Sequence, residues 1–166
     1  MSRSPPSSRR SIPRFTGRRH DHGRCVSRAV AAAAELCKAR GVRLTALRRR
    51  VLELVWRGHR PVGAYEILER LGGEGRAAAP PTVYRSLDFL LGQGLVHRIE
   101  SRHAFIGCAD PGAAHSGQFL ICDRCGNTLE LDDDDIAGSV RRSAEQLGFR
   151  VAGQLVEVRG LCPACG

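Results

Sequence analysis

The amino-acid sequence predicts an α+β protein, with a helix-rich N-terminal half followed by a smaller α/β half. Apolar residues recur with the period of an α-helix through the first half. Two short segments of alternating polarity follow, as in a β-hairpin. The second half mixes short apolar strands with one helix, and it contains two C-x-x-C pairs.

The formal charge of +9 is unevenly distributed along the 166 residues. Residues 1–24 and 25–96 each carry +6, whereas residues 97–166 carry −3. This asymmetry indicates that the basic N-terminal half binds a polyanionic partner and that the acidic C-terminal half has a different task. A merely soluble basic surface is the alternative. No apolar run reaches the roughly 20 residues that span a bilayer, and the Arg-rich start lacks a signal peptide's apolar segment. We therefore expect a cytoplasmic protein without a membrane partner.

The first 24 residues are rich in Arg, Ser and Pro and show no hydrophobic period. Such a segment cannot bury enough apolar surface to offset its ordering entropy, so residues 1–24 are expected to be disordered. The arginines could add nonspecific attraction to phosphate. His20 and His22 form only a two-ligand pair, and whether they bind a metal stays open.

Four helices are expected next. Residues 25–40 contain strong helix formers, and Gly41 can cap their end. Thr45 can cap a second helix, in which apolar residues form a stripe with helical spacing. A short third helix covers residues 63–71. Pro80 and Pro81 suit the first turn of a fourth helix, which ends near Gly92. Residues 95–100 and 103–108 then form the hairpin.

Helices followed by a hairpin in a basic segment predict a winged helix-turn-helix DNA-binding domain over residues 25–108. Its fourth helix would enter the major groove with Thr82, Tyr84 and Arg85 near its exposed start. Arg85 could pair with guanine, Tyr84 could contact a thymine methyl group or a phosphate, and the hairpin would touch phosphates. Alternatively, Tyr84 packs against the protein and Arg85 is a solvated surface charge.

The C-terminal half begins after a loop at residues 109–117, which we interpret as a hinge. Residues 118–166 form the second domain, with strands ending at Cys122 and covering 127–131, a helix over 136–147 and a last strand over 150–159. The four aspartates at 132–135 precede the helix, where carboxylates complement its positive end. Binding of a hard cation there is the less favoured interpretation.

The two C-x-x-C pairs predict a structural zinc site. Four thiolates in a tetrahedral shell suit zinc and leave no open position for a substrate. Without an export signal, metal thiolates are favoured over disulfides; iron binding or redox-active pairs are the alternatives. The predicted ligands are Cys122, Cys125, Cys162 and Cys165.

The remaining donors make a second candidate zinc site, so we expect two Zn²⁺ ions per monomer. Its ligands would be His97, Cys108, His115 and Glu130. Each also has a simpler interpretation as a surface, packing or strand residue. A catalytic zinc usually keeps only three protein ligands and an open position, and no H-E-x-x-H or deaminase pattern is present. We therefore expect sensing rather than catalysis, with no small-molecule substrate; a zinc-dependent hydrolase is the remote alternative.

Several segments resemble the ferric-uptake-regulator (Fur) superfamily, and most closely its zinc-uptake-regulator branch. They include PPTVYRSLDFLLGQGLVHRIESRHAFIGC, QFLICDRCG and GLCPAC, and the resemblance covers residues 26–166. It implies a homodimeric repressor, with residues 118–166 as the dimerisation domain. It further implies that zinc-loaded protein binds operator DNA to control zinc uptake genes.

The resemblance also implies roles for the residues already identified. The four paired cysteines match the structural zinc site, the other four donors match the regulatory zinc ligands, and Tyr84 and Arg85 match DNA-contacting positions. Iron and peroxide sensors of the superfamily usually carry a run of histidines and an aspartate before the first C-x-x-C pair. Here that segment reads AAHSGQFLIC, with His115 alone. The missing histidines and aspartate, together with the soft Cys108 thiolate, favour zinc over iron or manganese as the sensed metal. An iron, manganese or peroxide sensor of the same superfamily is a nearer alternative than a hydrolase. His103 is left out of the ligand set.

Overall fold

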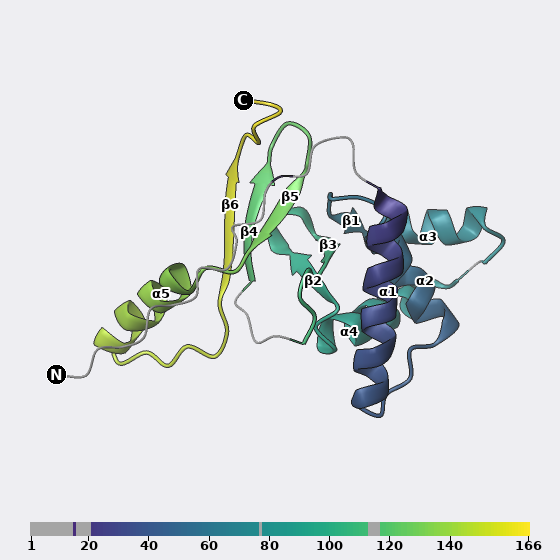
Figure 1. The fold of residues 1–166 in the computed structure, drawn as a ribbon, viewed down its shortest axis with the longest axis horizontal. Helices are drawn as coiled ribbons and strands as arrows, with labels where there is room; N and C mark the ends of the chain where they lie inside the picture. Colours follow the sequence, from purple (N-terminus) through teal and green to yellow (C-terminus); the bar gives the residue numbers. More distant parts are fainter. Residues whose placement is uncertain (1–14, 16–20, 77, 113–116) are drawn as a thin grey trace.

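The chain folds into a helical N-terminal half and a C-terminal half built on a small sheet, with the strands of a hairpin between them (Figure 1). The computed structural model describes residues 15, 21–76, 78–112 and 117–166. Most of the predicted disordered tail lies outside these residues, as does His115. The predicted α+β class is confirmed.

Four helices form the N-terminal half: α1 (His22–Ala39), α2 (Ala46–Val55), α3 (Ala64–Gly73) and α4 (Pro80–Gly92). The side chain of Thr45 accepts a hydrogen bond from the N–H of Arg48, as predicted for an N-cap. Asp21 caps α1 in the same way, so this helix begins three residues earlier than predicted. The helix α4 starts at the predicted proline.

The hairpin consists of β2 (Val96–Ile99) and β3 (Ala104–Gly107), joined by a 3₁₀ turn at Glu100–Arg102. A two-residue strand, β1 (Val62–Gly63), pairs with β3 and gives the order β1-β3-β2. This strand was not predicted. Helices followed by a three-stranded wing confirm the winged helix-turn-helix architecture.

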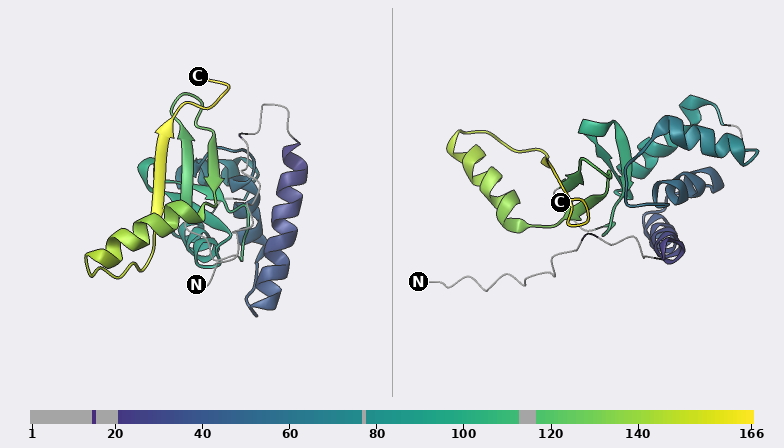
Figure 2. Two further views of the ribbon diagram at one scale, coloured as in Figure 1. Left: turned by 60° about the vertical axis from the view of Figure 1, so that its left-hand side comes forward. Right: turned by 90° about the horizontal axis from the view of Figure 1, so that it is seen from above.

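The C-terminal half contains β4 (Gly117–Cys122), β5 (Thr128–Leu131), α5 (Asp134–Gln146) and β6 (Leu155–Gly160). The sheet order is β5-β4-β6, with β4 antiparallel to β5 and parallel to β6. The last strand begins five residues later than predicted. In Figure 2, α5 and this sheet lie to one side of the wing and the four helices to the other. The side chain of Asp133 caps α5 by accepting from Asp135 and Ile136, in accordance with the helix-start interpretation of the aspartates.

Two apolar clusters hold the fold together. The larger one fills the helical half, where side chains such as Leu52, Ile67 and Leu87 are almost fully buried. The smaller one joins the wing to β4 through Ile99, Ile106, Phe119 and Ile121. The wing therefore packs against both the helical N-terminal half and the C-terminal sheet. None of the described helices is long and apolar enough to cross a membrane.

Candidate metal centres

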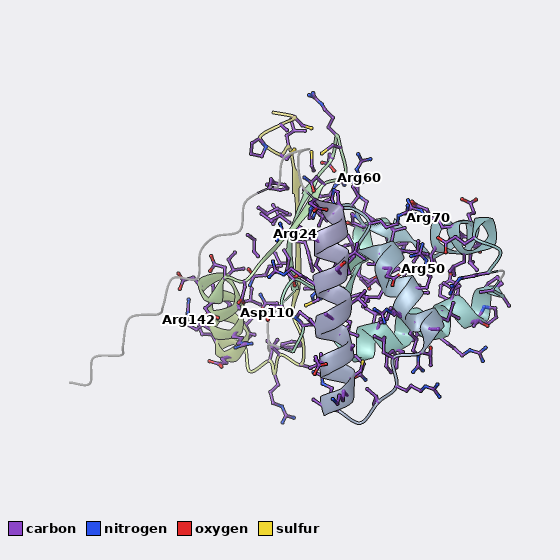
Figure 3. All side chains as sticks on the ribbon, turned by 45° about the vertical axis from the view of Figure 1, so that its right-hand side comes forward. Arg24, Arg50, Arg60, Arg70, Asp110 and Arg142 are labelled. Atoms are coloured by element: carbon purple, nitrogen blue, oxygen red, sulfur yellow. The ribbon has the colours of Figure 1, made fainter. Side chains whose placement is uncertain are left out.

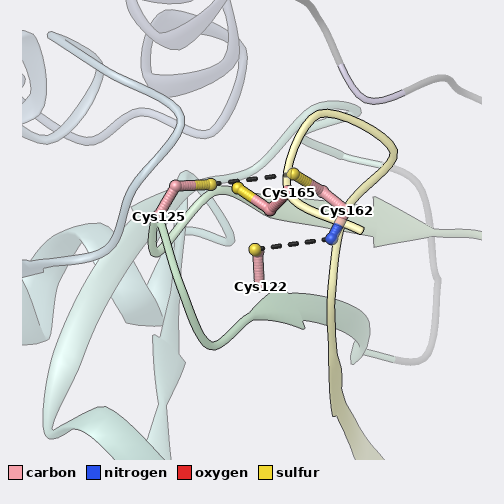
Figure 4. Close-up of side chains that lie close together, drawn as sticks. All are labelled: Cys122, Cys125, Cys162 and Cys165. Atoms are coloured by element: carbon pink, nitrogen blue, oxygen red, sulfur yellow. Dashed lines mark hydrogen bonds between the residues drawn. The ribbon is translucent and has the colours of Figure 1, made fainter.

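The two C-x-x-C pairs meet because β4 and β6 run in parallel. Cys122 ends β4, opposite Gly160 at the end of β6, so the turns that follow both strands lie at the same end of the sheet. The sulfur atoms of all four cysteines lie within 4.8 Å of one another. Figure 4 shows the four side chains gathered together. The Sγ atoms of Cys125 and Cys162 are 3.7 Å apart. Tetrahedral Zn–S bonds of ~2.3 Å imply sulfur separations of ~3.8 Å, so the spacing fits zinc.

Backbone groups stabilise the thiolate form of Cys122, whereas Cys165 favours the neutral thiol. N–H groups of Cys125 and Cys162 lower the pKa of the Cys122 thiol to about 6. Two effects raise the pKa of the Cys165 thiol to about 12: the larger is its hydrogen bond with the Cys162 side chain, and the second is burial of the sulfur away from water. Holding all four sulfur atoms as thiolates at neutral pH therefore requires a cation, and the soft donor set suits Zn²⁺.

Three of the four donors predicted for the second site also come together. His97 lies on β2, Cys108 follows β3 and Glu130 lies on β5, and their ligand atoms lie within 4.8 Å of one another. Nε2 of His97 is 2.7 Å from Oε1 of Glu130. The other Glu130 oxygen accepts a hydrogen bond from the N–H of Ala109 at 3.0 Å. The set thus spans the wing and the C-terminal sheet. The fourth predicted donor, His115, lies outside the described residues.

The chemistry of these three donors fits a borderline-soft cation. Burial, together with the nearby Glu130 charge, raises the pKa of the Cys108 thiol to about 12. A cation opposes both effects and stabilises the thiolate, which makes this buried sulfur a good zinc ligand. The ring of His97 also contacts Phe119 edge-on, with centroids 5.2 Å apart, which restricts its orientation.

Within the described residues, these are the two groups of three or more donors close enough to share an ion. His22 lies against His59 with ring centroids 4.9 Å apart, and the described residues place no third donor with them. His20 lies outside the described part of the chain. His103 caps the 3₁₀ turn of the wing in a left-handed conformation (φ 47°) and belongs to neither group.

The exposed start of α4 carries the residues predicted to contact DNA. Tyr84 is 42% exposed, Arg85 is exposed, and Nη2 of Arg85 lies 3.3 Å from Oγ1 of Thr82. The opposite face of α4 is buried through Val83, Leu87 and Leu90. Tyr84 therefore does not pack into the core. Two arginines labelled on the helical half in Figure 3, Arg50 and Arg70, form ion pairs with glutamates.

The tip of the wing contacts the C-terminal half. Arg102 pairs with Asp123, and Glu157 accepts hydrogen bonds from the wing backbone. The contact of the hairpin with phosphates stays a prediction. Sequence reasoning missed Asp123 and Glu157 because each lies far along the chain from its partner and has no spacing that marks a role.

The chain is similar to known metal regulators. The model of the Ferric uptake regulator family matches residues 39–159. The zinc uptake regulation protein of Escherichia coli is 38% identical over 137 residues, covering 82% of this chain and 80% of that protein. A structure described as a zinc uptake regulator complexed with zinc and DNA has a TM-score of 0.79 at 36% identity, covering 84% of this chain and 93% of that chain.

Two structures of another relative, XcZur, differ in how well they match. At 46% identity, the holo form has a TM-score of 0.75 and covers 81% of this chain and 94% of that chain. The apo form has a TM-score of 0.50 and covers 84% of this chain and 97% of that chain. The sequence identity is the same in both cases, whereas the TM-score is higher for the holo form. By TM-score this chain is thus more similar to the holo structure than to the apo structure.

Proposed function

We propose, since the chain belongs to the Ferric uptake regulator family, that it is a zinc-responsive transcriptional repressor that binds operator DNA as a homodimer. The observation that carries the proposal is the donor set His97, Cys108 and Glu130, which joins the wing to the C-terminal sheet. A ligand at this junction can bias how the two halves are arranged. The residues thus link a metal site to a DNA-reading helix.

The two donor sets are assigned different tasks. The four cysteines tie the ends of β4 and β6 together and are proposed to hold a structural zinc. The second set, completed by His115, is proposed to hold the regulatory zinc, giving two Zn²⁺ per monomer. A shell filled by four protein ligands has no open position for substrate, which argues against a hydrolase.

Zinc is preferred over iron or manganese at the regulatory site. Cys108 supplies a thiolate, and thiolates select zinc over the harder divalent ions. The similarity to the zinc uptake regulation protein of E. coli supports the same choice. An iron, manganese or peroxide sensor of the same family is the alternative, and it predicts DNA binding that responds to those signals instead.

DNA recognition is assigned to the start of α4. Thr82, Tyr84 and Arg85 lie on its solvent side, while its other face is fixed in the core. An exposed guanidinium at this position can donate two hydrogen bonds to guanine in the major groove. The resemblance to a zinc uptake regulator solved with zinc and DNA supports this assignment.

The C-terminal half offers a surface for a second copy. The edge strand β6 borders only β4 in the described sheet, so its outer edge can pair with another strand. Large apolar side chains lie exposed on α5, on β6 and in the segments next to them, and exposed apolar surface of this kind favours burial against a partner. They are Ile136, Val140, Leu147, Phe149, Leu155, Val158 and Leu161. We assign residues 118–166 to dimerisation, 25–108 to DNA binding and 109–117 to the hinge.

The proposed mechanism follows from this arrangement. When bound, zinc supplies fixed bonds between donors of the wing and of β5. His97 and Cys108 move with the recognition helix because the wing packs against the same core as α4, whereas Glu130 moves with the dimer. Fixing the three donors together sets the separation of the two recognition helices, which must match half-sites ~34–36 Å apart. Zinc and DNA affinities are then linked reciprocally, typically by about 1–3 kcal/mol.

The test replaces Cys108 by Ser, with Cys25→Ser as the matched control because Cys25 belongs to neither donor set. DNA duplexes are first selected from a random library by the zinc-loaded wild-type chain. We expect Cys108→Ser to remain a folded dimer and to lose zinc-dependent DNA binding, while Cys25→Ser retains it. A Cys108→Ser chain that unfolds would show that the second site is structural, and unchanged zinc-dependent binding would remove the proposed role.

A further inference from the structure

The tip of the wing is held by a carboxylate of the C-terminal sheet. Oε1 of Glu157, on β6, accepts a hydrogen bond from the N–H of Glu100 at 2.7 Å. Oε2 accepts from the N–H of Ser101 at 3.1 Å. These N–H groups open the 3₁₀ turn, where backbone donors have no partner within the turn. A single side chain thus satisfies two adjacent donors from more than fifty residues away.

The Glu157 carboxylate is charged at neutral pH. Burial by itself raises its pKa, but the hydrogen bonds from Ser101 and Glu100 outweigh this effect and keep the pKa below its usual value of 4.5. Its contacts with the wing are therefore charge-assisted, and such hydrogen bonds are roughly twice as strong as neutral ones.

A second carboxylate contributes at the same tip. Asp123 lies 3.2 Å from Nη2 of Arg102 on the wing and 2.9 Å from Nε of Arg159 on β6. These side chains are largely exposed, so each ion pair is worth little alone. Glu157 carries more weight because it is half-buried and binds backbone, which costs less side-chain entropy than an ion pair between two long side chains.

The tip contacts lie at the opposite end of the hairpin from the regulatory donors. His97 and Cys108 lie toward its base, where β2 begins and β3 ends. Between base and tip, Ile99 and Ile106 pack on Phe119, which is the partner of Glu157 in the β4–β6 register. A hairpin held only at its base can pivot, whereas one held at both ends has a fixed orientation.

We infer that Glu157 is a positioning residue for the regulatory metal site: it holds the wing tip on β6 and so keeps His97 and Cys108 in reach of Glu130. This inference rests on the proposed regulatory zinc site. A site whose donors are already in place loses less conformational entropy on binding, so it binds more tightly. Glu157 itself does not touch the metal.

The experiment measures the free zinc concentration that half-saturates the second site in the full-length chain, using a competing chelator of known affinity. The variants are Glu157→Ala and Glu157→Gln, with Glu145→Ala as the matched control because Glu145 is exposed near the end of α5. Loss of two charge-assisted hydrogen bonds should raise the half-saturating zinc on the order of tenfold for Glu157→Ala. Glu157→Gln should lie between this variant and the wild type, and Glu145→Ala should match the wild type. The zinc held by the four cysteines should be unaffected in all of them.

Amide hydrogen exchange at Glu100 and Ser101 provides the second readout. Faster exchange in Glu157→Ala together with weaker zinc binding supports the inference. Faster exchange with unchanged zinc binding overturns it, since the contact would exist without positioning the donors. Unchanged exchange also overturns it. If Glu157→Ala fails to fold, the near-isosteric Glu157→Gln decides by the same two readouts. The proposed function fails separately, if DNA binding by the wild type does not depend on zinc.

Discussion

Gly107 lies immediately before Cys108, and it has no room for a side chain. A Cβ built at this position would lie 2.7 Å from Cδ2 of Trp56 and closer still to Cε2 and Nε1. Real Cβ atoms essentially never approach within 3.0 Å of another heavy atom. The indole ring is rigid and packs against the helical core, so it has little freedom to give way. Gly107→Ala must therefore displace either the ring or the end of β3.

Overpacking of this kind costs about 1–3 kcal/mol. For a chain of this size each kcal/mol shifts the melting temperature by roughly 2–4 °C, so the zinc-saturated variant should melt roughly 2–12 °C lower. Because Cys108 moves with β3, the second zinc site should also weaken. The matched control is Gly72→Ala on α3, where an added Cβ meets nothing within 4 Å. Alanine there should stabilise the helix by about 0.5–1 kcal/mol.

Thermal unfolding followed by circular dichroism measures both changes, and the fluorescence of Trp56, the only tryptophan of the chain, reports on the packing directly. A Gly107→Ala protein with the melting temperature and tryptophan spectrum of the wild type would refute the close approach of Trp56 to β3. A similar loss of stability in Gly72→Ala would instead point to a general effect of the substitution.

Three further predictions concern DNA, the dimer and pH. Arg85→Ala should weaken binding to selected duplexes by about 1–3 kcal/mol and relax sequence preference, whereas Arg142→Ala on α5 should not; equal effects in gel-shift titrations would contradict the role of Arg85. Val158→Asp places a charge on the exposed apolar surface of β6 and should yield monomers in sedimentation experiments, so an unchanged dimer would exclude this surface. Because the folded pKa of Glu157 is lowered, its contribution to stability should be complete above its usual value of 4.5 and should disappear as the pH falls through the lowered value. The difference in unfolding free energy between wild type and Glu157→Gln measures this contribution, and a difference that grows toward acid would contradict it.

The sequence was informative wherever a local pattern carried the signal. Helical periods, the proline start of α4 and the alternation of the wing strands each depend on neighbouring residues, and all were predicted close to their observed bounds. The structure also brings Cys122, Cys125, Cys162 and Cys165 together, as their paired spacing predicts. Their binding of zinc, like that of His97, Cys108 and Glu130, stays a prediction.

Features that depend on distant contacts could not be read from the sequence. The strand β1 has only two residues, which is too short for an alternating pattern, and it exists because β3 offers it an edge. The parallel pairing of β4 with β6 is set by the path of the chain through α5. The contacts of Glu157 with the wing tip, and of Trp56 with Gly107, join residues about fifty positions apart. No spacing rule marks such residues in a single sequence.

We propose that the site at His97, Cys108 and Glu130 controls DNA binding through zinc. The most direct test measures zinc per monomer and DNA binding together as free zinc is buffered downward. We expect two zinc ions per monomer at high zinc, and loss of the more weakly held ion in parallel with loss of DNA binding. One zinc per monomer, with DNA binding indifferent to the zinc buffer but restored by iron or manganese, would contradict it.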